Sequence, residues 1–79
     1  MADSDQKVIT FFSHYGALTF KKKYARCTLR PVPRSLSSSC GTAAYAEGDV
    51  DTSLFDENTD SMYERTPDGW RLLWQREKD

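Results

Sequence analysis

Hydrophobic positions near the start of the chain predict one strand followed by one helix. Residues 7–12 (Lys-Val-Ile-Thr-Phe-Phe) are rich in β-branched and aromatic side chains, which favour a strand. Ser13 is a suitable N-cap for a helix from His14 to about Arg26, although Gly16 excludes a capping box. Spacings of three and four residues then predict a buried stripe made of Ala17, Phe20 and Tyr24, with Leu18 and the stem of Lys21 at its margins.

The middle of the chain predicts two short strands and a brief helix. Residues 27–32 are expected to form a strand that ends at two prolines, which cannot continue a central ladder. A polar loop (34–39) and a strand of small residues with Tyr45 (41–46) follow. Asp49 or Asp51 is then expected to cap a short helix over residues 51–57.

The end of the chain predicts a β-hairpin. Residues 61–66 and 69–75 are expected to pair through the turn Pro67-Asp68-Gly69. Trp70 and Trp74 are four positions apart in the last strand, so a regular strand would point both to the same side.

This order of elements predicts an α+β fold with an antiparallel sheet. The closest architecture is a ferredoxin-like βαββαβ sandwich with a C-terminal hairpin extension. Residues 1–6 are expected to be a flexible N-terminal tail and residues 7–79 a single domain, which is near the lower size limit for one hydrophobic core.

Charge is unevenly distributed along the chain. No acidic residue lies between Gln6 and Ala46, where seven of the eleven Lys and Arg residues stand, and an acidic segment runs from Glu47 to Glu64. This pattern predicts one positive and one negative face. The run Lys21-Lys22-Lys23 with Arg26 is expected to be a solvated helix end, and the alternative is a surface that docks an acidic protein. Because the sequence pI is about 5.7, nucleic acid is not an expected partner.

Cysteine usage indicates a reducing compartment. Two cysteines do not make a disulfide framework, and the start of the chain lacks the pattern of a signal peptide. No apolar stretch approaches the roughly 20 residues that span a bilayer, so we expect a cytoplasmic protein with no membrane association. Cys27 is expected to be a small buried apolar residue; the alternative is a resolving thiol for Cys40.

Cys40 is the candidate nucleophile. Pro31 and Pro33 stiffen the entry to its loop, and Gly41 leaves the sulfur accessible. Positive charge and hydrogen-bond donors favour a thiolate, and the residues expected to supply them are Arg30, Arg34, Ser38, Ser39 and Gly41. The competing interpretation is an ordinary solvated loop with an incidental cysteine.

The segment from Pro31 to Arg34 (Pro-Val-Pro-Arg), followed by residues 38–41 (Ser-Ser-Cys-Gly), resembles the small prokaryotic selenium/sulfur carrier protein-like family. Phe11-Phe12-Ser13 and Ala17-Leu18 also match that family, and the resemblance covers roughly residues 7–65. Lys21, the short 51–57 helix and the Trp-rich hairpin depart from the family pattern.

The resemblance implies a ferredoxin-like carrier that receives sulfur or selenium on Cys40 from a cysteine desulfurase-like donor and passes it to an unknown acceptor protein. Such a protein is a carrier more than a complete enzyme. It is expected to hold no cofactor of its own and to be a monomer or weak homodimer.

Two other function classes stay open. One is a non-catalytic interaction module that docks a partner through its polar loop and basic helix end. The other is a redox-responsive protein in which Cys40 forms a disulfide with Cys27 or with another chain. His14, the only histidine, could activate Cys40 or complete a metal site with both cysteines, but its spacing matches no known pattern, so no metal is expected.

Overall fold

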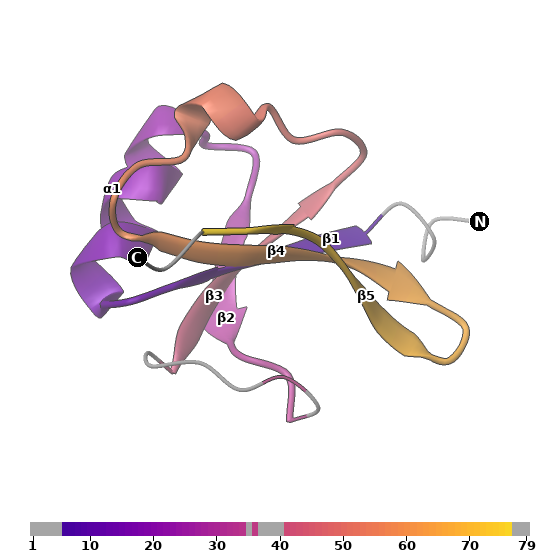
Figure 1. Cartoon of the computed structure of the whole chain (residues 1–79). Coiled ribbons are helices and arrows are strands. Elements are labelled where there is room, and N and C mark those ends of the chain that lie inside the picture. Colours follow the sequence, from indigo (N-terminus) through magenta and orange to yellow (C-terminus); the bar gives the residue numbers. More distant parts are fainter. Residues whose placement is uncertain (1–5, 35, 37–40, 77–79) are drawn as a thin grey trace.

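One α-helix packs on one face of a five-stranded antiparallel sheet in the computed structural model, which describes residues 6–34, 36 and 41–76 (Figure 1). The strand order across the sheet is β2-β3-β1-β4-β5, and every neighbouring pair is antiparallel. The α+β class is therefore confirmed. The elements in chain order are β1 (Gln6–Phe11), α1 (His14–Lys23), β2 (Thr28–Pro31), β3 (Thr42–Glu47), the 3₁₀ turn η2 (Thr52–Leu54), β4 (Thr59–Thr66) and β5 (Gly69–Gln75).

The predicted N-cap of the helix is confirmed, and the helix ends earlier than predicted. Ser13 Oγ accepts a hydrogen bond from the Gly16 N–H (3.3 Å), as an N-cap does. The last helical residue is Lys23, because Tyr24 leaves the helical conformation and the chain turns to bring Cys27 into the core. Ala17 and Phe20 form the buried stripe, whereas Leu18 is 44% exposed and lies outside it.

The predicted helix over residues 51–57 is wrong, because only the 3₁₀ turn η2 forms there. Asp51 caps this turn by accepting the Ser53 N–H at 2.9 Å. Phe55 then adopts an extended backbone, which brings its ring against Phe20 and Trp74 (centroids 5.9 and 4.8 Å away). The turn ends early because Phe55 packs into the core.

The core lies between α1 and the sheet. Its sheet side is a row of directly paired residues that crosses all five strands: Leu29, Ala44, Ile9, Met62 and Trp74. On the helix side, the ring of Phe20 packs against Phe11, with centroids 5.6 Å apart. The segment around η2 joins the same core through Leu54 and Phe55, so α1 and this segment cover the same face of the sheet (Figure 1).

A β-bulge in the hairpin corrects the expected arrangement of the two tryptophans. Met62 pairs with Trp74 but Tyr63 pairs with Leu72, so Leu73 is an extra residue on β5. Cross-strand partners point to the same face of a sheet. Trp70 pairs with Arg65, which is three positions from Met62 on β4, so Trp70 and Trp74 lie on opposite faces.

The face of the sheet opposite α1 is called the open face here. Its central row runs through Thr28, Tyr45, Val8, Tyr63 and Leu72, one residue from each strand. Val8 in this row is fully buried, whereas Tyr45 and Tyr63 beside it are half-buried. Across the described ranges, no helix has the length and apolar composition needed to cross a membrane.

Candidate functional site

The predicted nucleophile Cys40 and the neighbouring Ser38 and Ser39 lie outside the described residues. The two ends of the segment that contains them meet, because the Val32 N–H donates to the Gly41 carbonyl at 3.1 Å. Gly41 is exposed, and a Cβ built on it would meet no atom within 4 Å. A side chain at position 41 would therefore meet none of the described residues.

Arg30 and Arg34, the two predicted cations of this site, are both exposed. Arg30 lies on β2 and belongs to the open face, where it pairs with Ala43. Arg34 lies in the turn after Pro33. Neither arginine forms an ion pair with a described carboxylate.

The only histidine lies beside the start of β3. His14 Nδ1 is 3.1 Å from Thr42 Oγ1, a hydrogen bond between residues 28 positions apart in sequence. Since Thr42 follows Gly41, His14 stands at the base of the segment that carries Cys40. Sequence spacing could not show this, because the helix start and β3 come together only when β1 and β3 pair.

Cys27 is buried, as predicted, with 1% of its surface exposed. Burial raises the pKa of its thiol, against the weaker opposing effects of the Lys21 charge and of a backbone hydrogen bond. Lys21 Nζ donates to the carbonyls of Ala25 (3.1 Å) and Cys27. These bonds tie the last turn of α1 to the backbone of Cys27. Among the described residues, no three His, Cys, Asp or Glu side chains gather in a way that could hold a metal ion.

The predicted basic helix end does not form one continuous patch. Lys21 bonds to backbone carbonyls, and Lys23 Nζ forms an ion pair with Asp56 Oδ2 at 3.0 Å. Lys22 is exposed. Much of the charge in this run therefore stabilises the chain around α1.

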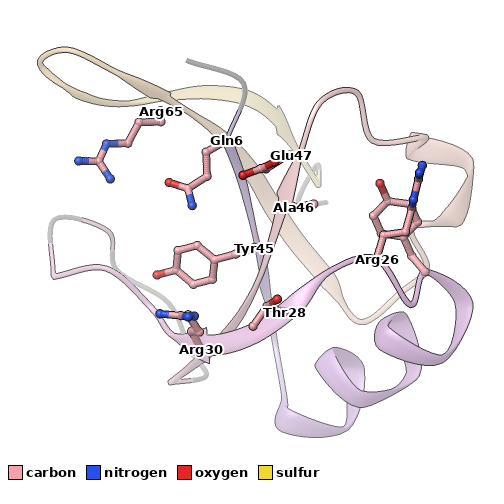
Figure 2. Close-up of a pocket in the computed structure, with 9 residues that line it drawn as sticks. Gln6, Arg26, Thr28, Arg30, Tyr45, Ala46, Glu47 and Arg65 are labelled. Carbon is pink, nitrogen blue, oxygen red and sulfur yellow. The ribbon is translucent and has the colours of Figure 1, made fainter. Parts of the chain in front are cut away.

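A hollow of about 690 Å³ on the open face brings together arginines from three parts of the chain. Arg26 comes from the turn after α1, Arg30 from β2 and Arg65 from β4. In Figure 2 the Tyr45 ring lies between Arg30 and Arg65, with Gln6 above it and Arg26 at the far end. The Tyr45 hydroxyl donates to the Pro31 carbonyl at 2.8 Å, which holds the ring in place.

The charges of two of these arginines, Arg30 and Arg65, affect the hydroxyl of Tyr45. Burial raises the pKa of the Tyr45 hydroxyl, and the positive charges of Arg30 and Arg65 oppose that rise. Both guanidinium groups are therefore close enough to stabilise a negative charge placed beside this ring.

A second, smaller hollow of about 430 Å³ adjoins the first and shares Tyr45 and Arg65 with it. Trp70, Pro33 and Pro67 line this part. The guanidinium of Arg65 lies 5.3 Å from the Trp70 ring centroid, in a cation–π contact. Sequence reasoning did not select Tyr45 or Arg65, and it favoured a core position for Trp70 over an interface, because only the strand register shows that the three share one face.

Comparisons with known proteins found no matching family model, no matching curated protein and no matching solved structure. Membership of the selenium/sulfur carrier family therefore stays a prediction from the residues quoted above. Two arrangements can support chemistry or binding: the open space beside Gly41 with His14 at its base, and the arginine-lined hollow on the open face.

Proposed function

We propose that this protein is a small sulfur or selenium carrier that receives the chalcogen on Cys40 from a cysteine desulfurase-like protein and passes it to a second protein. The observation that carries the proposal is the burial of Cys27. A protein with two cysteines, one of them enclosed and with a raised pKa, has a single thiol suited to attack on a partner's sulfur.

The surroundings of the segment from residue 33 to residue 40 support this role. Its ends meet at the Val32–Gly41 hydrogen bond, and Gly41 is unobstructed. Arg30 and Arg34 carry charges that no described carboxylate neutralises, and positive charge favours a thiolate. His14, whose ring bonds to Thr42 at the start of β3, is the proposed acceptor of the thiol proton.

The proposed transfer is a thiol-exchange reaction. The Cys40 thiolate attacks the terminal sulfur of a persulfide on the donor, the donor's S–S bond breaks, and the donor cysteine leaves as a thiolate. The oxidation level of the transferred sulfur does not change, so the step needs no further oxidant or reductant. It does need a reduced Cys40, which fits a cytoplasmic location.

We also propose that the fold is a ferredoxin-like sheet in which the second helix is reduced to η2. Strands β2-β3-β1-β4 with a helix after β1 follow the order of a split βαβ arrangement, and β5 extends the sheet at one edge.

The test is sulfur loading followed by mass spectrometry. The protein is incubated with a cysteine desulfurase and L-cysteine, and the expected product is the intact chain heavier by one sulfur atom. The Cys40→Ser variant should gain no mass, and Cys27→Ser should load as the wild type does. Absence of an adduct on the wild type, or an adduct on Cys40→Ser, would reject the carrier role.

The two alternative functions predict different behaviour of the cysteine thiols. A redox pair of Cys27 and Cys40 requires the enclosed Cys27 sulfur to become accessible, and mild oxidation would then remove both thiols together. A non-catalytic interaction module would leave Cys40 unloaded and unreactive.

A further inference from the structure

The open face of the sheet presents positive charge that no described carboxylate pairs with. The side chains of Arg26, Arg30 and Arg65 form no ion pair with a described carboxylate. The Arg65 guanidinium lies over the ring of Trp70. All three line one hollow. Long cationic side chains from separate elements that converge without a carboxylate partner are typical of a surface that receives an anion.

The acidic part of the chain lies largely elsewhere. Two described carboxylates line the two hollows: Glu47 lies in the first, two positions after Tyr45 on β3, and Asp68 lies in the second. Residues 49–57 pass over the helix side of the sheet, where Asp56 pairs with Lys23. The first hollow therefore holds three arginines and one described carboxylate, so it is locally positive in a protein whose net charge is −1.

Aromatic rings accompany these charges. Tyr45 and Tyr63 flank Val8 in the central row of the open face. Trp70 lies in the adjoining hollow with the Arg65 guanidinium over its ring. Flat aromatic and guanidinium surfaces on an antiparallel sheet are platforms on which unpaired bases stack.

We propose that the open face binds single-stranded nucleic acid. The phosphates would be held by Arg26, Arg30 and Arg65, while bases stack on Trp70 and the neighbouring rings. The hollow is open and continues into a second one, and its cations come from three different elements. An extended polyanion fits this shape better than a single nucleotide, which needs an enclosing pocket.

This inference goes beyond the proposed carrier function and does not depend on it. Arg30 belongs to both proposed sites, but no residue of the nucleic-acid surface is a cysteine. The Cys40→Ser variant should therefore bind nucleic acid as the wild type does. Failure of sulfur loading and failure of nucleic-acid binding are therefore separate results.

The first experiment measures fluorescence anisotropy of a labelled 12-nucleotide oligo(U) at low salt. Arg30→Gln and Arg65→Gln should each weaken binding by about tenfold or more, because each removes a charge-assisted contact to a phosphate. Each should also reduce the slope of log K against log salt by about 0.7, the value for one phosphate of a single strand. Lys22→Gln removes the same charge from the exposed helix and should change binding less than twofold.

The second experiment uses the two tryptophans as reporters. In Trp74→Phe the remaining Trp70 lies on the open face, and its fluorescence should change when oligo(U) binds. In Trp70→Phe the remaining Trp74 packs on the helix side against Phe55, and its fluorescence should not change.

Several results would overturn the inference. The first is no binding of oligo(U) at low salt. The second is an equal loss of affinity for oligo(U) in Lys22→Gln and Arg30→Gln. The third is a competitor, inorganic phosphate or poly-glutamate, that displaces labelled oligo(U) as effectively as unlabelled oligo(U) does. A fluorescence change from Trp74 without one from Trp70 would place the ligand on the helix side of the sheet and would also contradict the inference.

Discussion

Trp70 and Trp74 belong to one strand but lie on opposite faces of the sheet, because Leu73 forms a bulge between them. Trp74 packs edge-on against Phe55, with centroids 4.8 Å apart, and joins the core. Trp70 lies on the open face under the Arg65 guanidinium. The two rings should therefore differ in their effect on stability.

Trp74→Ala is expected to lower the free energy of unfolding by about 2 kcal/mol, somewhat less than the truncation of a fully buried ring. Trp70→Ala should cost less, about 1 kcal/mol, since Trp70 is half-buried but lies outside the core cluster, where the Arg65 guanidinium is its ring contact. Urea denaturation followed by far-UV circular dichroism measures both values. Equal losses of unfolding free energy for the two variants would contradict the placement of the two rings on opposite faces of the sheet.

Gly16 is predicted to resist substitution although it lies in α1. A Cβ at this position would stand 2.6 Å from Asn58 Cβ and 3.2 Å from the Asn58 carbonyl oxygen. Gly16→Ala should therefore destabilise the protein by about 1–3 kcal/mol through overpacking, even though alanine favours a helix by up to about 1 kcal/mol.

The control for this prediction is the double variant Gly16→Ala with Asn58→Gly, which removes the clashing Cβ. The two substitutions should be less destabilising together than the sum of their separate effects. A stabilised Gly16→Ala single variant would show that α1 does not pack against Asn58 in this way.

Cys27 is predicted to be inert to thiol reagents in the folded protein. Its enclosure and raised pKa both reduce the accessible thiolate. In a Cys40→Ser background, dithionitrobenzoate should react with Cys27 only when denaturant is added. Rapid reaction of the native protein would mean that the sulfur is exposed.

Cys27→Ser is expected to cost about 1–3 kcal/mol, since a hydroxyl would replace the thiol among the apolar side chains of the core. Thermal unfolding against a Cys27→Ala variant separates this polar effect from the loss of volume. A serine variant as stable as the alanine variant would show that the hydroxyl finds a partner.

Asp56 should make part of the stability dependent on pH. Burial disfavours its ionised form, but hydrogen bonds from the Asn58 N–H and from Lys23, with the charges of Lys23 and Arg76, outweigh this and lower its pKa. A carboxyl whose pKa is lower in the folded state stabilises the protein above its unfolded pKa of about 3.9. This contribution is lost as the pH falls through the folded value.

Asp56→Asn should reduce stability at pH 7 by about 0.5–1 kcal/mol, because the side chain is partly exposed and screened by solvent. The difference from the wild type should fade below about pH 4. Urea midpoints at several pH values measure it. Glu57→Gln, an exposed neighbour with the same change in charge, should have little effect at any pH, and equal losses for both variants would exclude a specific role for the Lys23 pair.

Local patterns predicted several elements correctly. The β-branched residues before Phe11 form β1, Ser13 caps α1, and Pro67-Asp68-Gly69 joins the last two strands. These features depend on interactions between residues close in the chain, so short windows of sequence contain them. The burial of Cys27 also followed from its type and position.

The candidate sites were predicted less completely. Arg30 was selected for its closeness to Cys40 in sequence, yet the strand register places it diagonally from Tyr45 on the open face. Arg65 is 35 positions from Arg30 and lies in the same hollow only because β4 pairs with β1 and β1 with β3. No local pattern contains that information.

The sequence by itself determined the α+β class, the position of the first helix and the hairpin turn, because backbone preference and side-chain periodicity act over a few residues. Tertiary structure alone decided three things: the helix over 51–57 gave way to a 3₁₀ turn, Trp70 and Trp74 separated onto two faces, and Arg30 and Arg65 came together beside Tyr45. Each depends on packing or register between distant segments, where burying Phe55 or adding one bulge residue outweighs local preference.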